Sequence, residues 1–142
     1  MKVVIVSGGF DPIHSGHIAY FKSAKMHGEK LIVALNSDAW LKKKKGKFFM
    51  PFNERKAIIE SINYVDEVID FKDDELGSCI NALKKAKNIY PNDELFFANG
   101  GDRVKGNTPE MSVCEKLDVT MLWGVGGGKI QSSSWLINGE EK

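Results

Sequence analysis

The sequence predicts a single α/β domain with a five-stranded, mostly parallel sheet and helices on both faces. Short uncharged runs rich in β-branched residues alternate along the chain with segments whose apolar residues recur at helical spacing. Glycine clusters follow three of the predicted strands, at positions 8–9, 100–101 and 126–128. With 142 residues, the chain has the length of one domain, and we expect residues 1–142 to form it.

The first 36 residues predict a strand, a helix and a second parallel strand. Residues 2–7 are a buried strand that ends at Gly-Gly, and residues 17–27 have helical spacing. Gly28 is placed to end this helix, and residues 30–36 form the second strand. The connection between the two strands is expected to be right-handed.

The middle of the chain predicts one strand between two helices. Residues 40–52, WLKKKKGKFFMPF, are basic and lack periodicity, which indicates a loop or a short helix. Asn53 is the expected N-cap of the next helix, residues 67–71 form the third strand, and residues from about 74 to 90 form a further helix.

The last third completes the sheet. Residues 93–98 and 119–123 are the fourth and fifth strands, and Pro109 opens the helix between them. The serines at 132–134 are placed to cap a last short helix over residues 135–138. Ligands of such sheets bind at the carboxyl ends of the strands, so the three glycine clusters predict one shared site.

Composition excludes several classes of function. The chain has 20 Lys and Arg against 19 Asp and Glu, so no overall charge attracts nucleic acid, and any anion must be held locally. No apolar run approaches the roughly 20 residues that span a membrane, and the N-terminal run VVIV is too short for a signal peptide, so we expect a cytoplasmic protein. Cys79 and Cys114 lack ligand spacing and are expected to be reduced, half-buried thiols.

The stretch SGGFDPIHSGH, residues 7–17, carries the strongest functional signal. His14 and His17 lie three residues apart at the start of a predicted helix, where backbone N–H groups and the helix dipole favour an anion. Imidazoles added there can donate to phosphate oxygens that gain charge during a reaction. A lone histidine at such a corner is more often a cap or a packing residue, and a metal site lacks a third ligand in the loop. The stretch is neither a GxGxxG turn nor a P-loop.

Five segments together resemble a known family. GFDPIHSGH is similar to the HxGH signature of the nucleotidyltransferase superfamily, the cytidylyltransferase-like proteins. KLIVALNSD resembles that family's second strand, and KKGKFFMPFNERKAIIESINYVDEVI resembles its Lys-Gly loop, Glu-Arg helix start and third strand. GGDR and GGKIQSSSWLI resemble the segment after the fourth strand and the final Ser/Thr-rich helix start. The matches follow the family's order from residue 3 to residue 137 and imply a Rossmann-like fold.

The resemblance implies an enzyme that moves a nucleoside monophosphate from CTP or ATP to a small sugar- or polyol-phosphate and releases pyrophosphate. Mg²⁺ is expected as the counter-ion of the triphosphate rather than in a protein cage. A homodimer is common in the family and is expected here. The alternative is a non-catalytic, nucleotide-binding regulatory protein on the same fold.

The resemblance also assigns roles to residues. The implied catalytic residues are His14, His17 and Lys45. The implied nucleotide-binding residues are Gly8, Gly9, Phe10, Asp11, Gly16, Gly101, Asp102, Ser132, Ser133 and Ser134. The implied residues for the acceptor and its phosphate are Asp38, Lys44, Arg55, Arg103 and Lys129.

Several of these residues have a second interpretation. Arg55 reaches a phosphate or pairs with Glu60 on the helix surface, and Asp11 orients a histidine or helps to hold magnesium. For any single lysine of residues 42–45 a solvated basic surface is the favoured interpretation, whereas the group as a whole is interpreted as phosphate-binding. The serine run is also consistent with plain helix capping. The aromatic residues around the basic loop form a lid over the nucleotide or bury at a dimer interface: Trp40, Phe48, Phe49 and Phe52.

The nucleotide base stays open. Glycerol-phosphate cytidylyltransferases are similar at YVDEVI and in length, but they carry an arginine before the Ser/Thr run where this chain has glycine. Heptose-phosphate adenylyltransferases are similar at NSD, at Lys-Gly and at Gly-Gly-Asp, although Arg103 stands where they usually have tyrosine.

Overall fold

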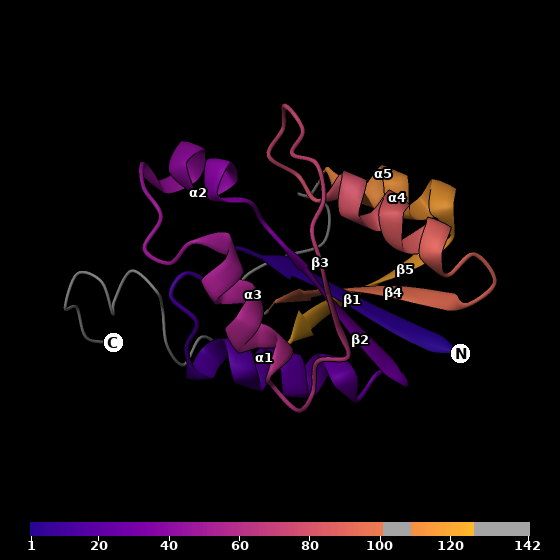
Figure 1. Ribbon diagram of the computed structural model, residues 1–142. Coiled ribbons are helices and arrows are strands. Elements are labelled where there is room, and N and C mark those ends of the chain that lie inside the picture. The colour runs from indigo at the N-terminus through magenta and orange to yellow at the C-terminus, as the bar shows by residue number, and fades with distance from the viewer. Residues whose placement is uncertain (101–108, 127–142) are drawn as a thin grey trace.

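The predicted parallel sheet is present in a computed structural model of the chain, which describes residues 1–100 and 109–126 (Figure 1). In chain order, the strands of these residues are β1 (Lys2–Gly8), β2 (Lys30–Leu35), β3 (Glu67–Ile69), β4 (Glu94–Gly100) and β5 (Val119–Val125). Their order across the sheet is β3-β2-β1-β4-β5, and all four neighbouring pairs are parallel. The predicted α/β class is confirmed.

Helices cover both faces because alternate side chains of each strand point to opposite sides. In β1, Val3 and Ile5 join one apolar core, whereas Val4 and Val6 join the other. The helices α4 (Ile80–Ile89) and α5 (Glu110–Leu117) cover the face of Val3. The helices α1 (Ser15–Lys25) and α3 (Phe52–Glu60) lie on the opposite face (Figure 1).

The strand order creates a switch point beside β1. From β1 the chain moves outward to β2 and β3, then returns to the other side of β1 to form β4 and β5. The loops that leave β1 and β4 therefore diverge to opposite faces at the carboxyl edge, which is where ligands bind in sheets of this kind. The short helix α2 (Asp38–Lys45) follows β2 at the same edge (Figure 1).

Two predicted helix starts are wrong, and one is confirmed. α1 begins at Ser15 with His14 as its N-cap, so His14 and His17 lie at the start of a helix as predicted. α3 begins at Phe52 after Pro51, so Asn53 lies inside the helix instead of capping it. α4 begins at Ile80 rather than near residue 74, because Gly77 has a φ of +67° and the Asp74 carboxylate binds the Ser78 amide at 2.8 Å.

Of two further segments, one agrees with its prediction and one does not. The basic segment, predicted as a loop or a short helix, begins within the short helix α2, which Ser37 caps and Gly46 ends in the left-handed region. Gly28 is not the C-cap of α1, which is Met26. A Cβ at Gly28 would lie 2.7 Å from the Lys2 carbonyl oxygen, so glycine is required there by close approach of the chain.

Candidate active site

The turn between β1 and α1 is compact because Gly8 has no side chain, which lets the Phe10 ring pack directly against the backbone of the turn. Phe10 has a φ of +50°, and its buried ring packs edge-on against His17 at 4.8 Å between centroids. A Cβ at Gly8 would come within 2.8 Å of that ring. The Phe10 ring therefore fixes the side of the turn on which His17 lies.

At the start of α1, the ring of each of the two histidines accepts a hydrogen bond from a backbone amide. His14 is the N-cap, and its Nδ1 accepts the Gly16 amide at 3.1 Å. The His14 amide in turn donates to Nδ1 of His17 at 3.2 Å, and the two rings stack with centroids 3.7 Å apart. Because both Nδ1 atoms accept, the hydrogen-bond pattern assigns the ring proton of each neutral imidazole to Nε2. Each ring thus keeps one N–H donor at Nε2.

His17 is held in its neutral form. Burial, then the neighbouring His14 and then the positive charge of Lys45 lower the pKa of His17 from 6.5 to about 3. The ring therefore donates a hydrogen bond without carrying a charge near pH 7. The cationic charge of the site must come from elsewhere.

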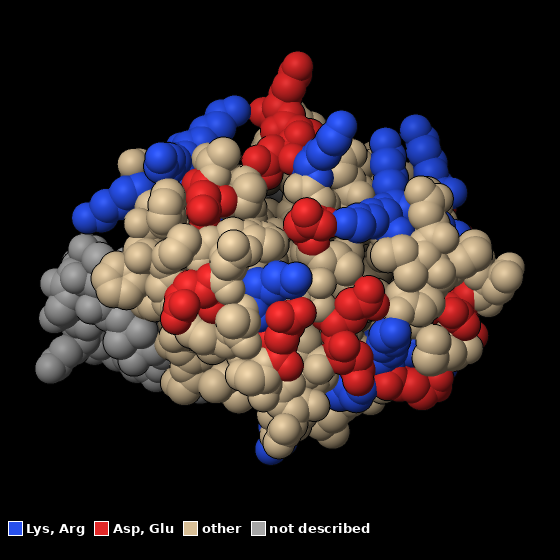
Figure 2. All heavy atoms as spheres, in the orientation of Figure 1, with Lys and Arg blue, Asp and Glu red and all other residues tan. Residues whose placement is uncertain are grey.

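The lysines of α2 supply that charge. The first turn of α2 is anchored, since Ser37 caps it and Leu41 is fully buried, whereas residues 42–46 are all exposed. The ammonium of Lys44 lies 5.1 Å from the Trp40 ring centroid, and Lys45 is near enough to lower the pKa of His17. In Figure 2, blue side chains project from the position of α2.

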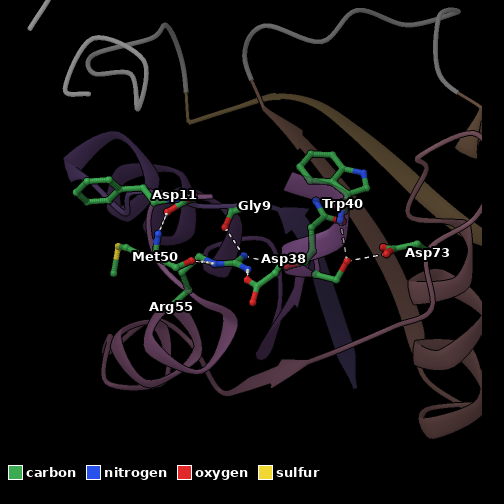
Figure 3. A network of polar contacts seen from close by, with 10 residues as sticks. Gly9, Asp11, Asp38, Trp40, Met50, Arg55 and Asp73 are labelled. Carbon is green, nitrogen blue, oxygen red and sulfur yellow. Dashed lines mark hydrogen bonds and ion pairs between the residues drawn. The ribbon is translucent and has the colours of Figure 1, made fainter. Parts of the chain in front are cut away.

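A buried arginine joins the histidine turn to the lysine helix (Figure 3). Arg55 is fully buried; its guanidinium donates to the carbonyl oxygens of Met50, Gly9 and Asn36 at 2.8–2.9 Å. The same group pairs with the Asp38 carboxylate at 2.7 Å in the first turn of α2. One side chain therefore connects four segments by hydrogen bonds: the histidine turn, the end of β2, the first turn of α2, and the loop before α3.

Asp11 completes this connection from the histidine turn. Its carboxylate, 2% exposed, accepts the amides of Phe49 and Met50, each at 2.6 Å (Figure 3). Met50 is therefore held at its amide by Asp11 and at its carbonyl by Arg55. The loop that follows Gly46 is fixed to the turn at residues 49–50.

A pocket of about 260 Å³ opens at this edge of the sheet. On the α1 side it is lined by Gly8, Phe10, His17 and Tyr20, and Lys44 reaches it from α2. Its opposite side is lined by Asn36, Trp40, Gly77, Cys79, Asn99 and Glu110. The pocket thus crosses the carboxyl ends of β1 and β4 from one face of the sheet to the other.

The family follows from comparison with known proteins. A sequence profile described as cytidylyltransferase-like matches residues 5–124. The chain belongs to the cytidylyltransferase-like family. It is 36% identical over 112 residues to the bifunctional protein HldE of Enterobacter sp. strain 638, and 35% identical to HldE of Salmonella arizonae. Each match covers 71% of this chain and 24% of the relative, so the chain spans about a quarter of the length of these curated relatives.

Solved structures of similar fold agree with this assignment. The lipopolysaccharide core biosynthesis protein from Thermoplasma volcanium GSS1 has a TM-score of 0.66 and 26% identity, over 87% of this chain and 94% of that chain. A putative nicotinate-nucleotide adenylyltransferase from Vibrio parahaemolyticus has a TM-score of 0.61 over 99% of this chain and 89% of that chain. Its 17% identity shows a shared fold alone.

The structure of this cytidylyltransferase-like chain brings part of the predicted site together. Gly8, Phe10, His17 and Lys44 line one pocket, and His14 is stacked on His17. Gly16 donates its amide to His14, and Gly9 lies against Leu41 of α2 so closely that a Cβ would come within 2.6 Å. Their contacts with a nucleotide or an acceptor stay predictions.

Two secondary interpretations are wrong. Arg55 does not pair with Glu60 on the surface: it is buried and pairs with Asp38, and Lys56 forms the 3.9 Å pair with Glu60. Asp11 does not orient a histidine through the hydrogen bonds of its carboxylate, which go to Phe49 and Met50. Four N–H groups of Arg55 are already used by the protein, so its predicted contact with a phosphate would need the guanidinium to move or to use its remaining N–H.

The aromatic residues of the basic loop do not act as one group. Trp40 donates its indole N–H to the Gly77 carbonyl at 2.9 Å, and Phe52 packs beside the buried Arg55 and against the α1 and α3 core. Phe48 lies 5.4 Å from the Lys42 ammonium, whereas Phe49 is 65% exposed. Of these four residues, only Trp40 lines the pocket. Trp40 is therefore the one of the four that is placed to cover a bound nucleotide as a lid.

Sequence reasoning missed the polar residues on the far side of the pocket. Asn36 and Asn99 each stand at or just past the end of a buried strand, and that position was a usable signal. Glu110 carried no such signal, since an acidic residue after proline is ordinary in a first helical turn.

Several predictions lie outside the described residues. These concern Gly101, Asp102, Arg103, Lys129, Ser132, Ser133 and Ser134. The homodimer also stays a prediction. Within residues 1–100 and 109–126, no helix is long and apolar enough to cross a membrane.

Proposed function

We propose that this chain catalyses nucleotidyl transfer from ATP or CTP to the phosphate of a small sugar- or polyol-phosphate. The observation that carries the proposal is the pair of stacked imidazoles at the start of α1, each with its Nδ1 bound to a backbone amide. Neutral donors at a helix N-terminus, with lysines facing them, suit an anion that changes its charge distribution during reaction.

The transfer needs little covalent chemistry from the protein. An oxygen of the acceptor phosphate forms a bond to the α-phosphorus, and the bond from that phosphorus to the β-phosphate bridging oxygen breaks, releasing pyrophosphate. Charge builds on the α-phosphate and on the leaving pyrophosphate, so positioning and electrostatic stabilisation dominate. The two Nε2–H groups donate to these oxygens, and Lys44 and Lys45 balance the charge that the neutral histidines cannot.

Magnesium enters this proposal as part of the substrate. Within the described residues, no three His, Cys, Asp or Glu side chains gather in a group that fits a metal ion. The Asp11 carboxylate is engaged by two backbone amides, which suits a structural role better than metal binding. Mg²⁺ would therefore arrive on the triphosphate, where it shields the phosphate charges.

Pyrophosphate release tests the proposal. The purified protein is incubated with Mg²⁺ and each of ATP, CTP, GTP and UTP, against a panel of sugar and polyol phosphates. Acceptor-dependent release with ATP or CTP is expected, and it should be lost in His17→Ala but retained in His27→Ala, an exposed histidine beyond the end of α1. Tight nucleotide binding without release from any pair would favour the regulatory, non-catalytic alternative.

A further inference from the structure

The indole ring of Trp40 is held by three parts of the chain at the edge of the pocket. Its N–H donates to the Gly77 carbonyl at 2.9 Å, in the loop between β3 and α4. Its other end packs against the histidine turn, where a Cβ at Gly9 would lie 3.3 Å from Cζ3 of the ring (Figure 3). The Trp40 amide donates to the Ser37 hydroxyl at 3.0 Å. The ring that lines the pocket therefore has a fixed direction.

The loop that binds the Trp40 indole is also attached to the start of α2. The Ser37 hydroxyl, which caps α2, donates to the Asp73 carboxylate at 2.6 Å (Figure 3). Farther along the loop, Gly77 has a φ of +67°, and its amide donates to the Asp74 carbonyl at 3.2 Å. These bonds fix the carbonyl that accepts the indole N–H. The loop therefore orients Trp40 from outside α2.

Trp40 and Lys44 are neighbours on the surface of α2, because they lie four residues apart in one helix. The ammonium of Lys44 lies 5.1 Å from the centroid of the Trp40 ring. The negative face of an indole attracts a cation within about 6 Å, and at an exposed site this contact favours one position of the cation by about two- to fivefold. Both residues line the pocket. The ring therefore biases the ammonium toward the pocket without fixing it.

A second lysine of α2 has an aromatic partner in a different place. The ammonium of Lys42 lies 5.4 Å from the centroid of the Phe48 ring, in the loop after α2. Because Trp40 lines the pocket and Phe48 does not, the two rings draw lysines of one helix to different places. An ammonium has three N–H donors, so an ammonium that lies on one face of a ring still has N–H groups to offer to a phosphate.

We propose that Trp40 is a positioning residue: its indole, held by the Gly77 carbonyl, keeps the Lys44 ammonium at the pocket, where it meets the phosphate groups of the substrates. The proposal rests on the proposed function, because that function supplies the phosphate ligand. Trp40 itself needs no contact with the reacting atoms. Its effect should pass through Lys44 and depend on the electron density of the ring.

Fluorinated tryptophan tests this role with little change in shape. Fluorine withdraws electrons from the ring face, which weakens the attraction of a cation, and it makes the indole N–H a stronger donor. Tryptophans with one, two and four fluorine atoms are placed at position 40 alone. With the acceptor found in the panel, kcat/KM should fall along the series by about two- to fivefold in total. The same series in Lys44→Ala, or at Trp123 of β5, should have no effect.

Two ordinary substitutions separate positioning from packing. Trp40→Phe retains an aromatic face for Lys44, whereas Trp40→Leu retains only apolar bulk, and both lose the bond to Gly77. We expect a lower kcat/KM in Trp40→Leu than in Trp40→Phe, and equal values of the two in the Lys44→Ala background. A packing role would give the same ratio in both backgrounds. Thermal unfolding confirms that each variant is folded.

Binding of tripolyphosphate, measured by calorimetry, gives a result that needs no turnover. Its Kd should rise about two- to fivefold along the fluorinated series. A constant kcat/KM and Kd along the series, an equal response in Lys44→Ala, or no binding of tripolyphosphate would overturn the proposal while leaving nucleotidyl transfer in place. A rising Kd without pyrophosphate release from any acceptor would contradict the proposed function and leave the role of Trp40 standing.

Discussion

The histidine turn and the lysine end of α2 face the same pocket but are built in opposite ways. The turn is held by backbone bonds to both histidines, by the Phe10 ring and by a neutral, buried His17. Residues 42–46 are exposed, whereas α2 is anchored at its first turn and at the buried Leu41. The fixed half supplies directed N–H donors, and the exposed half supplies positive charge.

Under the proposed function, this difference lets one site satisfy two demands. Donors aimed at developing charge must be in place before the reaction, because reorganising them during the reaction would be costly. Lysines that neutralise a triphosphate must also admit it and release pyrophosphate, which favours a weakly held position. Arg55 and Asp11 set the limits of that position, since they fix the lysine helix at its start and the following loop at residues 49–50.

The largest effect should come from removing the connection between the two halves. Arg55→Met leaves three backbone carbonyls and the Asp38 carboxylate without their donor, and we expect a loss of at least about 3 kcal/mol in the free energy of unfolding. Urea unfolding measures it. Lys56→Met removes only the surface pair with Glu60 and should cost less than about 1 kcal/mol. Similar losses in the two variants would show that the Arg55 connection is not what holds the site.

The fixed half should be the more sensitive one in catalysis. His17→Ala removes a pre-oriented donor and should lower kcat by about 10²–10³-fold. Steady-state kinetics with the acceptor found in the panel measures this loss. His27→Ala should stay within twofold of the native chain. A His17→Ala enzyme with near-native kcat would remove the histidine turn from the reaction.

In the exposed half, the loss of kcat/KM should depend on which lysine is replaced. Lys44→Ala and Lys45→Ala each remove a cation beside the site and should lower kcat/KM by about ten- to a hundredfold. Lys43→Ala is the matched control on the same helix and should have a much smaller effect. Equal effects at all three positions would indicate a diffuse attraction by the basic surface instead of specific phosphate contacts.

The smallest effect should be at the end of α2. Gly46 has a φ of +85° with open space around its Cβ position, so Gly46→Ala meets backbone strain but no clash, and we expect a loss of about 1 kcal/mol. A Cβ at Gly100 also meets open space, but Gly100 lacks the positive φ, so Gly100→Ala should cost less. Thermal unfolding compares the two. A Gly46→Ala variant as stable as the native chain would show that the turn after α2 adapts freely.

Much of the fold could be predicted, because strand and helix patterns are local. The strands of residues 2–7 and 30–36 were readable from uncharged runs, and the glycines after them from the turn that a parallel sheet requires. The start of α4 could not be predicted, because the apolar spacing of this helix continues backward past Gly77, whereas the left-handed backbone of Gly77 keeps the helix from beginning before it. A helical pattern of apolar residues does not reveal that a single residue within it has a left-handed backbone conformation.

The site could be predicted where its functional side chains lie close together in the sequence. His14 and His17 stand together in the sequence, and their pairing at a helix start followed from spacing. The roles of Arg55 and Asp11 were not predictable, since all their partners except the Met50 carbonyl bound by Arg55 lie 17 to 46 residues away, and most are backbone atoms. Residue type does not indicate whether an arginine meets a ligand or the protein's own carbonyls.

Side-chain ¹⁵N–¹H spectra of the histidines, recorded from pH 4.5 to 8 with and without Mg-nucleotide, test the central claim most directly. His17 should carry its proton on Nε2 and show no titration in this range, because its pKa is lowered to about 3 by burial and by the neighbouring charges. The unfolded chain takes up this proton near pH 6.5 and the folded chain only near 3, so stability should fall as pH decreases between these values.

Adding Mg-nucleotide should shift the Nε2–H signals of both His14 and His17, with a smaller shift in Lys44→Ala. A His17 ring that titrates near its ordinary pKa of 6.5, that carries its proton on Nδ1, or that does not respond to nucleotide would contradict a fixed pair of neutral donors facing a triphosphate.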